Sequence, residues 1–163
     1  MKRTGSVVLI VVVLAGLMLG LSALFTVHQT QQALVLQFGE PRRVITEPGL
    51  HVKIPLIQNV IYLDKRLLQL DTPSFEAIAS DQKRLVVDAY LRYRIVDPLL
   101  FYQAVGSQAI ANARLQTTLE TSLREAIGTV SLIQIVSGQR DALMARATSS
   151  TKAQANNFGI EIV

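Results

Sequence analysis

The sequence contains no cysteine and no tryptophan, and it has only two histidines, His28 and His51. The lack of cysteine excludes disulfide bonds, thiolate nucleophiles and cysteine-ligated metals, as well as a lipid attached through an N-terminal cysteine. Neither histidine has a second ligand at metal-binding spacing, so we expect no metal and no cofactor. We expect His51 to stabilise a turn through a hydrogen bond and not to act in catalysis.

Phosphate-binding, catalytic and nucleic-acid-binding patterns are lacking too. The glycines are isolated from one another, so the sequence has no glycine-rich phosphate loop. The sequence also has no pattern of a nucleophile with a nearby base. The net charge is +4, and subtracting Lys2 and Arg3 leaves only +2 for the rest of the chain. Because no cluster of basic and aromatic residues is present, we expect no nucleic-acid binding. Because no nucleophile–base or metal-binding constellation is present either, we expect the protein not to be an enzyme.

The longest uncharged stretch runs from Gly5 to Val27, directly after Lys2 and Arg3. A helix of that length spans roughly 35 Å, enough to cross the ~30 Å hydrocarbon core with some tilt. The pattern predicts a transmembrane helix at residues 5–27 after a cytoplasmic tail at residues 1–4. A cleaved signal peptide is the alternative, but its apolar core has only ~7–15 residues and a convincing Ala-x-Ala site is missing here.

The charges around this segment predict its orientation. Basic residues precede it, whereas residues 28–39 carry no formal charge. The positive-inside rule therefore keeps the N-terminus in the cytoplasm and sends the rest of the chain across the membrane. Within the segment, Gly16 and Gly20 form a small-xxx-small motif that lets two membrane helices approach closely, although glycine is common in such helices in any case.

Beyond the segment, the hydrophobic pattern predicts an α+β fold with two subdomains. Alternation of apolar and polar residues indicates a β-rich subdomain at residues 28–96, and helical periodicity indicates an α/β subdomain at residues 97–163. The expected strands lie at residues 33–38, 42–45, 60–70, 75–79 and 85–96. The expected helices lie at residues 98–104, 108–127 and 137–158, and a final strand starts at Ile160.

Several residues mark the ends and faces of these helices. Asp97 and Ser107 are expected N-caps, and Gly159 is expected to end the last helix. The second helix should bury an i, i+4 ridge formed by Leu115, Leu119, Leu123 and Ile127. Because the sequence stops inside the final strand, we expect it to be the front part of a longer protein.

Two sets of residues are candidates for contacts with other molecules. The first is an apolar loop close to the membrane segment, which we interpret as a membrane-surface loop with buried core as the alternative; it comprises Lys53, Ile54, Pro55, Leu56 and Ile57. The second is a set of charged strand positions, which form either solvated faces and cross-strand ion pairs or contacts to a neighbouring subunit: Asp64, Lys65, Arg66, Asp88, Arg92 and Arg94.

Several motifs, in this order, resemble the SPFH family (stomatin, prohibitin, flotillin, HflK/C), also called band 7. They are Leu-Gln-Phe-Gly at residues 36–39, Glu-Pro-Gly-Leu-His-Val-Lys-Ile-Pro at 47–55, Leu-Asp-Lys-Arg at 63–66, Asp-Gln-Lys-Arg-Leu-Val-Val-Asp-Ala-Tyr at 81–90 and Tyr-Arg-Ile-Val-Asp-Pro at 93–98. Residues 101–106 and 137–144, with the short N-terminal tail, are most similar to the bacterial HflC group within that family. The resemblance covers nearly the whole chain.

The resemblance implies a role without a reaction. It implies an SPFH domain on a single-pass protein of the bacterial inner membrane, with the domain on the periplasmic side. It also implies contact with membrane lipid and assembly with an HflK-like paralogue into a large hetero-oligomer that regulates access to an FtsH-like membrane AAA protease. The alternatives are a stomatin-like organiser of lipid domains without a protease partner and, on weaker grounds, a membrane-tethered hydrolase.

Overall fold

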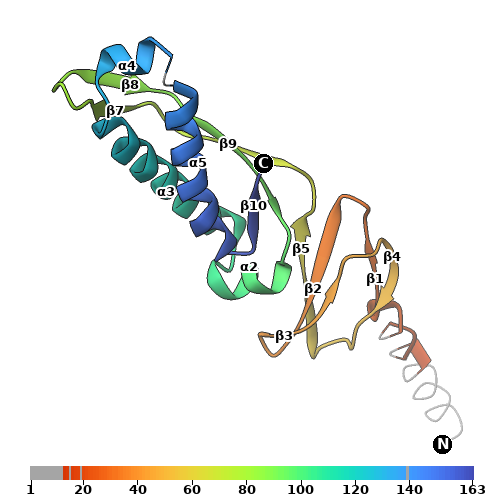
Figure 1. Cartoon of the computed structure of the whole chain (residues 1–163). Coiled ribbons are helices and arrows are strands. Elements are labelled where there is room, and N and C mark those ends of the chain that lie inside the picture. Colours follow the sequence, from red (N-terminus) through yellow and green to blue (C-terminus); the bar gives the residue numbers. More distant parts are fainter. Residues whose placement is uncertain (1–12, 15, 19, 139) are drawn as a thin grey trace, which may run out of the picture. The chain divides into compact units, whose positions relative to one another are not determined.

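A computed structural model (Figure 1) describes residues 13–14, 16–18, 20–138 and 140–163. The chain divides into two compact units, Met1–Asp64 and Lys65–Val163. The change of sequence pattern predicted a division after Val96, whereas the structure divides the chain after Asp64. The strands between Leu68 and Ile95 pair with one another and with the C-terminal strand, so they belong to the same unit as the helices.

The end of the predicted membrane helix differs from expectation. Described residues from Val13 to Ser22 are helical, but Leu24–Val27 forms strand β1, which pairs antiparallel with β4 (Gly49–Val52). The helix prediction through Val27 is therefore wrong over its last four residues. An apolar run alone does not distinguish a helix from a strand, and here burial alternates as it does in a strand.

Much of the rest of the membrane-helix prediction concerns residues that the structure does not describe. Residues 1–12, 15 and 19, which include the predicted cytoplasmic tail and more than a third of the predicted helix, lie outside the described part of the chain. Within the described residues, no helix combines the length and the apolarity that crossing a membrane requires.

The first unit contains a second, larger sheet. Its strands are β2 (Gln31–Gln37), β3 (Glu40–Ile45) and β5 (Gln58–Asp64), in the order β3-β2-β5 and all antiparallel. β2 and β3 are joined by a two-residue turn in which Phe38 and Gly39 both have positive φ, at 53° and 88°. Such turns match the right-handed twist of a hairpin.

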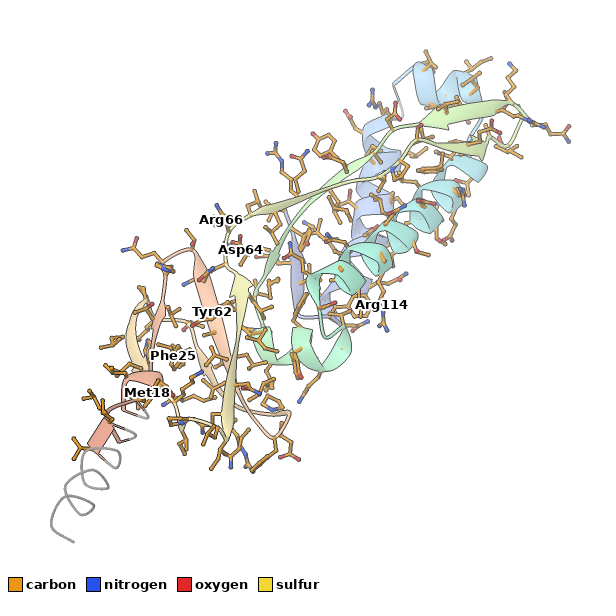
Figure 2. The ribbon with its side chains drawn as sticks, turned by 180° about the vertical axis from the view of Figure 1, so that it is seen from behind. Met18, Phe25, Tyr62, Asp64, Arg66 and Arg114 are labelled. Atoms are coloured by element: carbon orange, nitrogen blue, oxygen red, sulfur yellow. The ribbon has the colours of Figure 1, made fainter. Side chains whose placement is uncertain are left out.

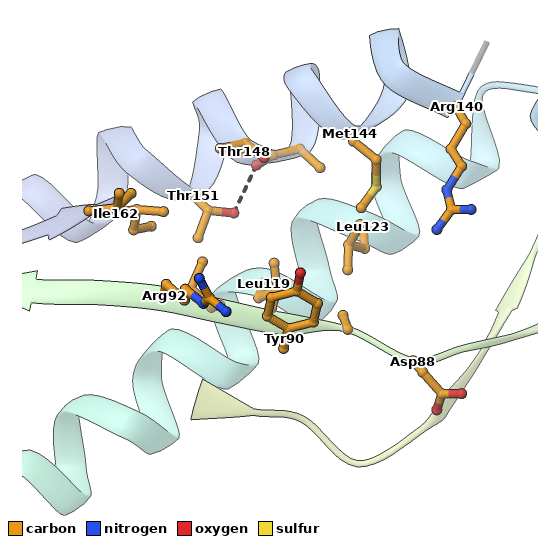
Figure 3. A pocket seen from close by; sticks show the side chains of 14 residues that line it. Asp88, Tyr90, Arg92, Leu119, Leu123, Arg140, Met144, Thr148, Thr151 and Ile162 are labelled. Atoms are coloured by element: carbon orange, nitrogen blue, oxygen red, sulfur yellow. Dashed lines mark hydrogen bonds between the residues drawn. The ribbon is translucent and has the colours of Figure 1, made fainter. Parts of the chain in front are cut away.

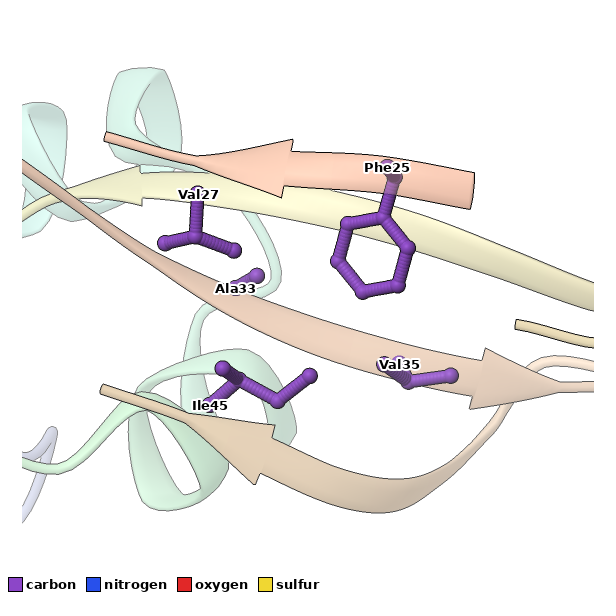
Figure 4. Packing of buried hydrophobic residues seen from close by; sticks show 5 residues of the cluster. All are labelled: Phe25, Val27, Ala33, Val35 and Ile45. Carbon is purple, nitrogen blue, oxygen red and sulfur yellow. The ribbon is translucent and has the colours of Figure 1, made fainter. Parts of the chain in front are cut away.

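The core of this unit lies between β1 and the larger sheet. Phe25 and Val27 project from β1 onto Ala33 and Val35 of β2 and Ile45 of β3 (Figure 4). All five side chains are buried. The last residues of the predicted membrane segment thus form part of the core of a folded unit.

The second unit, over its described residues, combines two sheets with four helices. One sheet has the order β10-β9-β6, from Ile160–Ile162, Tyr90–Ile95 and Leu68–Asp71, and the other pairs β7 (Phe75–Ile78) with β8 (Arg84–Val87). The helices are α2 (Pro98–Ala104), α3 (Gln108–Gly128), α4 (Leu132–Val136) and α5 (Arg140–Asn156).

Two predicted strands are each divided in the structure. The strand expected at residues 60–70 becomes β5 and β6, which belong to different sheets, and the strand expected at 85–96 becomes β8 and β9. A single period of two runs through the division between β8 and β9, so the sequence pattern does not reveal that division. Within β9 the predicted faces are confirmed, because Leu91, Tyr93 and Ile95 are buried while the intervening residues are exposed.

The helix N-caps are predicted correctly. One carboxylate oxygen of Asp97 accepts hydrogen bonds from the backbone N–H groups of Leu99 and Leu100, both at 3.0 Å. The Ser107 hydroxyl accepts from the N–H of Ile110 at 3.4 Å. The four ridge residues of α3 are buried as expected: Leu115, Leu119, Leu123 and Ile127. The helix expected from Ser137 begins later, at Arg140, and the short α4 before it was not predicted.

Gly159 connects α5 to β10 at a crowded position. Its φ is +68°, and a Cβ atom there would lie 2.5 Å from the carbonyl oxygen of Asp97. The Gly159 carbonyl accepts hydrogen bonds from the N–H groups of Val96 and Asp97, at 3.0 and 3.1 Å. Glycine is therefore needed both for the turn and for the close approach of two backbone segments.

A pair of phenylalanine substitutions tests the role of β1. Phe25 is 8% exposed and Phe38 is 82% exposed. We expect Phe25→Ala to destabilise the first unit by about 3 kcal/mol or more, since it removes a buried ring. We expect the matched Phe38→Ala to change stability by less than about 0.5 kcal/mol. Thermal unfolding of the full chain in detergent, followed by circular dichroism, measures both, and equal effects would contradict the placement of β1 in the core.

A pair of glycine substitutions separates crowding from backbone strain. Gly39 has a φ of +88°, and a Cβ there would meet nothing within 4 Å. Gly39→Ala should cost about 1–2 kcal/mol for the left-handed conformation alone. Gly159→Ala should cost about 1–3 kcal/mol beyond that, because the new methyl group overlaps Asp97. Denaturant titration of the two variants gives the difference, and a Gly159→Ala variant as stable as Gly39→Ala would rule the crowding out.

Candidate functional site

The β4–β5 loop, Lys53–Ile57, begins beside the end of the N-terminal helix. The backbone N–H of Lys53 donates to the carbonyl of Ala23 at 2.8 Å, one residue after the last described helical residue. The loop is closed by two bonds between Ile54 and Gln58: the Gln58 N–H donates to the Ile54 carbonyl, and the Ile54 N–H donates to Oε1 of Gln58, both at 2.9 Å. The loop is therefore a defined structure.

The tip of this loop presents apolar side chains to the outside. Leu56 is 95% exposed and has a φ of +68°, and Ile54 and Ile57 are also exposed. Non-glycine residues rarely adopt positive φ. Because the side chains of Ile54, Leu56 and Ile57 are exposed, the interpretation of the segment as buried core is excluded for these three residues. Lys53 and Pro55 are half-buried.

Sequence reasoning missed one residue at this end of the unit. In the pairing of β2 with β5, Gln37 lies opposite Gln58, so the Phe38–Gly39 turn adjoins the start of β5 and the apolar loop. Phe38 is exposed, as Ile54, Leu56 and Ile57 are. The hydrophobic pattern predicts Phe38 as the end of a strand at residues 33–38, so its place in a turn, where polar residues normally occur, is visible only in the structure.

Gly16 and Gly20 lie on the helical part of the described N-terminal residues. Four residues apart on a helix, they share one face. A Cβ at either position would meet no heavy atom of the described chain within 4 Å. That face is open to a neighbouring helix as far as the described residues go, and its use for helix packing stays a prediction.

The charged strand residues fall into two separate places. Asp64 is the last residue of β5, and Lys65 and Arg66 follow it in the connection to β6; Figure 2 labels Asp64 and Arg66 there. Lys65 and Arg66 are exposed. Asp88 lies between β8 and β9, where it is exposed.

Arg92 and Arg94 share the exposed face of β9. Arg94 forms an ion pair with Glu161 on the neighbouring β10, directly opposite in register. The Arg92 guanidinium lies over the ring of Tyr90, 6.0 Å from its centroid. Cross-strand pairing, one of the two readings for these residues, is thus confirmed for Arg94, and a contact to another subunit stays a prediction.

A cavity of about 460 Å³ lies in the second unit beside β9, α3 and α5 (Figure 3). Its described lining mixes apolar and cationic side chains, including Leu123, Met144, Arg92 and Arg140, and it holds no histidine. The Thr151 hydroxyl donates to the carbonyl of Ala147 at 2.8 Å. Within this described lining, Thr151 therefore has no basic partner that would activate it as a nucleophile.

The histidines behave as turn and surface residues. Nε2 of His51 lies 3.1 Å from the carbonyl oxygen of Glu47, and the ring packs 5.8 Å from that of Phe25. The prediction that His51 stabilises its turn is confirmed. Among the described residues, no group of three or more His, Cys, Asp or Glu side chains is arranged to hold a metal ion.

Comparison with known proteins bears directly on the resemblance. Residues 25–163 match the SPFH domain / Band 7 family. The protein HflC of Haemophilus influenzae is 33% identical over 153 residues, covering 87% of this chain and 52% of that protein. The "Modulator of FtsH protease HflC" of Escherichia coli K12 is 32% identical over 149 residues, covering 86% and 44%. HflC of Vibrio parahaemolyticus is 33% identical over 141 residues, covering 82% and 43%.

The chain thus spans about half the length of the curated relatives it matches. The family match starts at Phe25, inside β1, in agreement with a folded unit that includes this strand. A mixed α+β domain is also what the described strands and helices form. The predicted resemblance is confirmed, and the chain belongs to the SPFH domain / Band 7 family.

Proposed function

We propose that the protein is a non-catalytic, membrane-anchored scaffold subunit of the HflC type. In this proposal it assembles with an HflK-like paralogue and regulates the access of substrates to an FtsH-like membrane protease. Support comes from the family match and from relatives whose names include "Modulator of FtsH protease". Control acts through position and steric exclusion, so the chain itself needs no reacting groups.

The anchor in this proposal is shorter than the apolar run suggests. With Leu24–Val27 assigned to β1, residues 5–23 remain. A helix of that length covers roughly 28 Å, within the range of a spanning helix. Lys2 and Arg3 favour a cytoplasmic N-terminus, which would put the SPFH domain on the periplasmic side of the bacterial inner membrane.

The observation that carries the membrane contact is the hydrogen bond from Lys53 to Ala23. If the helix leaves the bilayer at Ala23, this bond holds the start of the apolar loop at the same level. Exposed Leu56 and Ile57 then enter the headgroup region, where burial of apolar side chains is favourable. Phe38 at the neighbouring turn adds a third apolar side chain to the same contact.

Contacts to other subunits are proposed for two surfaces. Gly16 and Gly20 would allow a second membrane helix to approach closely. The exposed face of β9, with Asp88 before it, presents charges that set register between partners, and the Asp64–Arg66 connection presents more. Charged surfaces of this kind favour a specific neighbour over a close relative, as a hetero-oligomer requires.

Fluorescence tests the membrane contact in the full chain. Because the sequence contains no cysteine, Leu56→Cys gives a single labelling site at the loop tip. In liposomes, an environment-sensitive dye at this site should shift to the blue and be quenched by nitroxide-labelled lipids. Tyr62→Cys, at a position 44% exposed near the other end of β5 in the same unit, is the matched control and should respond weakly. Equal quenching at the two sites would remove the support for the loop contact.

Affinity purification from native membranes tests the assembly. Under the proposal, the full chain recovers an FtsH-like protease and an HflK-like paralogue. A chain that begins at Ala23 keeps β1 but lacks the anchor, and we expect its recovery of both partners to fall at least tenfold because the high local concentration at the membrane is lost. A stable complex of the full chain without either partner would favour the stomatin-like lipid organiser instead.

A further inference from the structure

A second cavity lies in the first unit, directly beside the apolar loop. It measures about 370 Å³. Its walls come from β2, β3, the end of β4 and the start of β5, and its lining consists of Val35, Arg42, Arg43, Val52, Lys53, Ile54 and Gln58. Because a water molecule takes up only about 30 Å³ of the liquid, the cavity is large enough for a polar group of many atoms.

The described lining carries three cationic side chains and no acidic one. Arg43 is held in place because its Nη2 donates to the carbonyl of Val52 at 2.8 Å, across the gap between β3 and β4. A guanidinium has five N–H donors, so most of them stay available to a ligand. The backbone of Lys53 is fixed by the bond to Ala23, and Lys53 lines the cavity.

Arg42 has one competing partner. Its Nη2 lies 3.7 Å from a carboxylate oxygen of Glu40, and the side chains are 59% and 76% exposed. An ion pair this exposed contributes little, so an anion with better geometry displaces it at small cost. The three cations therefore favour an anionic group with several acceptor oxygens, and arginine suits phosphate in particular.

The surroundings indicate a lipid as the source of that phosphate. Ile54 lines the cavity and is itself exposed, and Leu56 projects from the same loop. A phospholipid has a phosphate in its headgroup and apolar chains next to it, so it can contact both the cationic cavity and the apolar side chains of the loop. A free anion would contact only the cationic side chains. The cavity also lies at the end of the unit where the N-terminal helix ends.

We propose that Arg42, Arg43 and Lys53 bind the headgroup phosphate of an anionic phospholipid. This inference rests on the proposed membrane contact of the apolar loop and adds a preference for lipid charge to it. The exposed loop supplies the apolar part of the contact, and the cavity supplies the part that distinguishes an anionic headgroup from a zwitterionic one.

Native mass spectrometry of the full chain in detergent tests this proposal. The chain is mixed with equimolar phosphatidylglycerol and phosphatidylcholine of the same acyl chains, and the ratio of the two lipid adducts is measured. We expect phosphatidylglycerol to dominate, and each of Arg42→Gln, Arg43→Gln and Lys53→Gln to lower the ratio by roughly fivefold. The triple variant should bring the ratio close to one.

A matched variant controls for net charge. Lys83→Gln, Arg84→Gln and Lys152→Gln together remove the same three charges from exposed positions of the second unit. This variant should retain the parent ratio, and a loss equal to that of the first triple variant would overturn the proposal. Because the single variants are measured as well, misfolding of the triple variant does not remove the test.

Two further measurements separate this inference from the proposed function. An unchanged adduct ratio in the cation variants, together with lipid quenching at Leu56→Cys, would overturn the headgroup site alone. Inorganic phosphate at millimolar concentration should not displace the lipid, and full displacement would identify a site for free phosphate instead.

Discussion

The pairing of β1 with β4 is the constraint on which the first unit depends. It turns the last residues of an apolar segment into a strand, and it places Phe25 and Val27 over β2 and β3. Because Lys53 bonds to Ala23 just beyond this pairing, the β4–β5 loop begins where the helix ends. The exposed loop, the Phe38 turn and the cationic cavity then lie at one end of the unit, although their residues come from separate parts of the sequence.

Local signals in the sequence predicted local structure well. Asp97 and Ser107 cap their helices as expected because a cap depends only on the next three residues. The α3 ridge is buried because its period is unambiguous. The division of the strand expected at residues 85–96 was not predictable in this way, since Leu85 and Leu91 follow one alternation although their strands join different sheets. Which sheet a strand joins is decided by contacts distant in sequence.

The candidate surfaces, too, depend on contacts between residues distant in sequence, which the sequence pattern does not predict. The loop at residues 53–57 was identifiable because apolar residues cluster there, but its exposure was not, since a core segment has the same composition. Phe38 escaped notice because its importance comes from the register of β2 with β5 and not from its neighbours in sequence. The three cations of the cavity come from separate segments, β3 and the start of the β4–β5 loop, so only the fold brings them together.

The single residue between the helix and β1 has a mechanical consequence. Ala23 alone separates Ser22 from Leu24, and it is bonded on both sides, to Gly20 and to Lys53. The helix and β1 are therefore joined without a flexible linker. In a chain anchored as proposed, the helix would tilt to match a thinner or thicker bilayer. Because no flexible linker follows the helix, the first unit would rotate together with it. The orientation of the first unit relative to the membrane would then depend on the thickness of the bilayer.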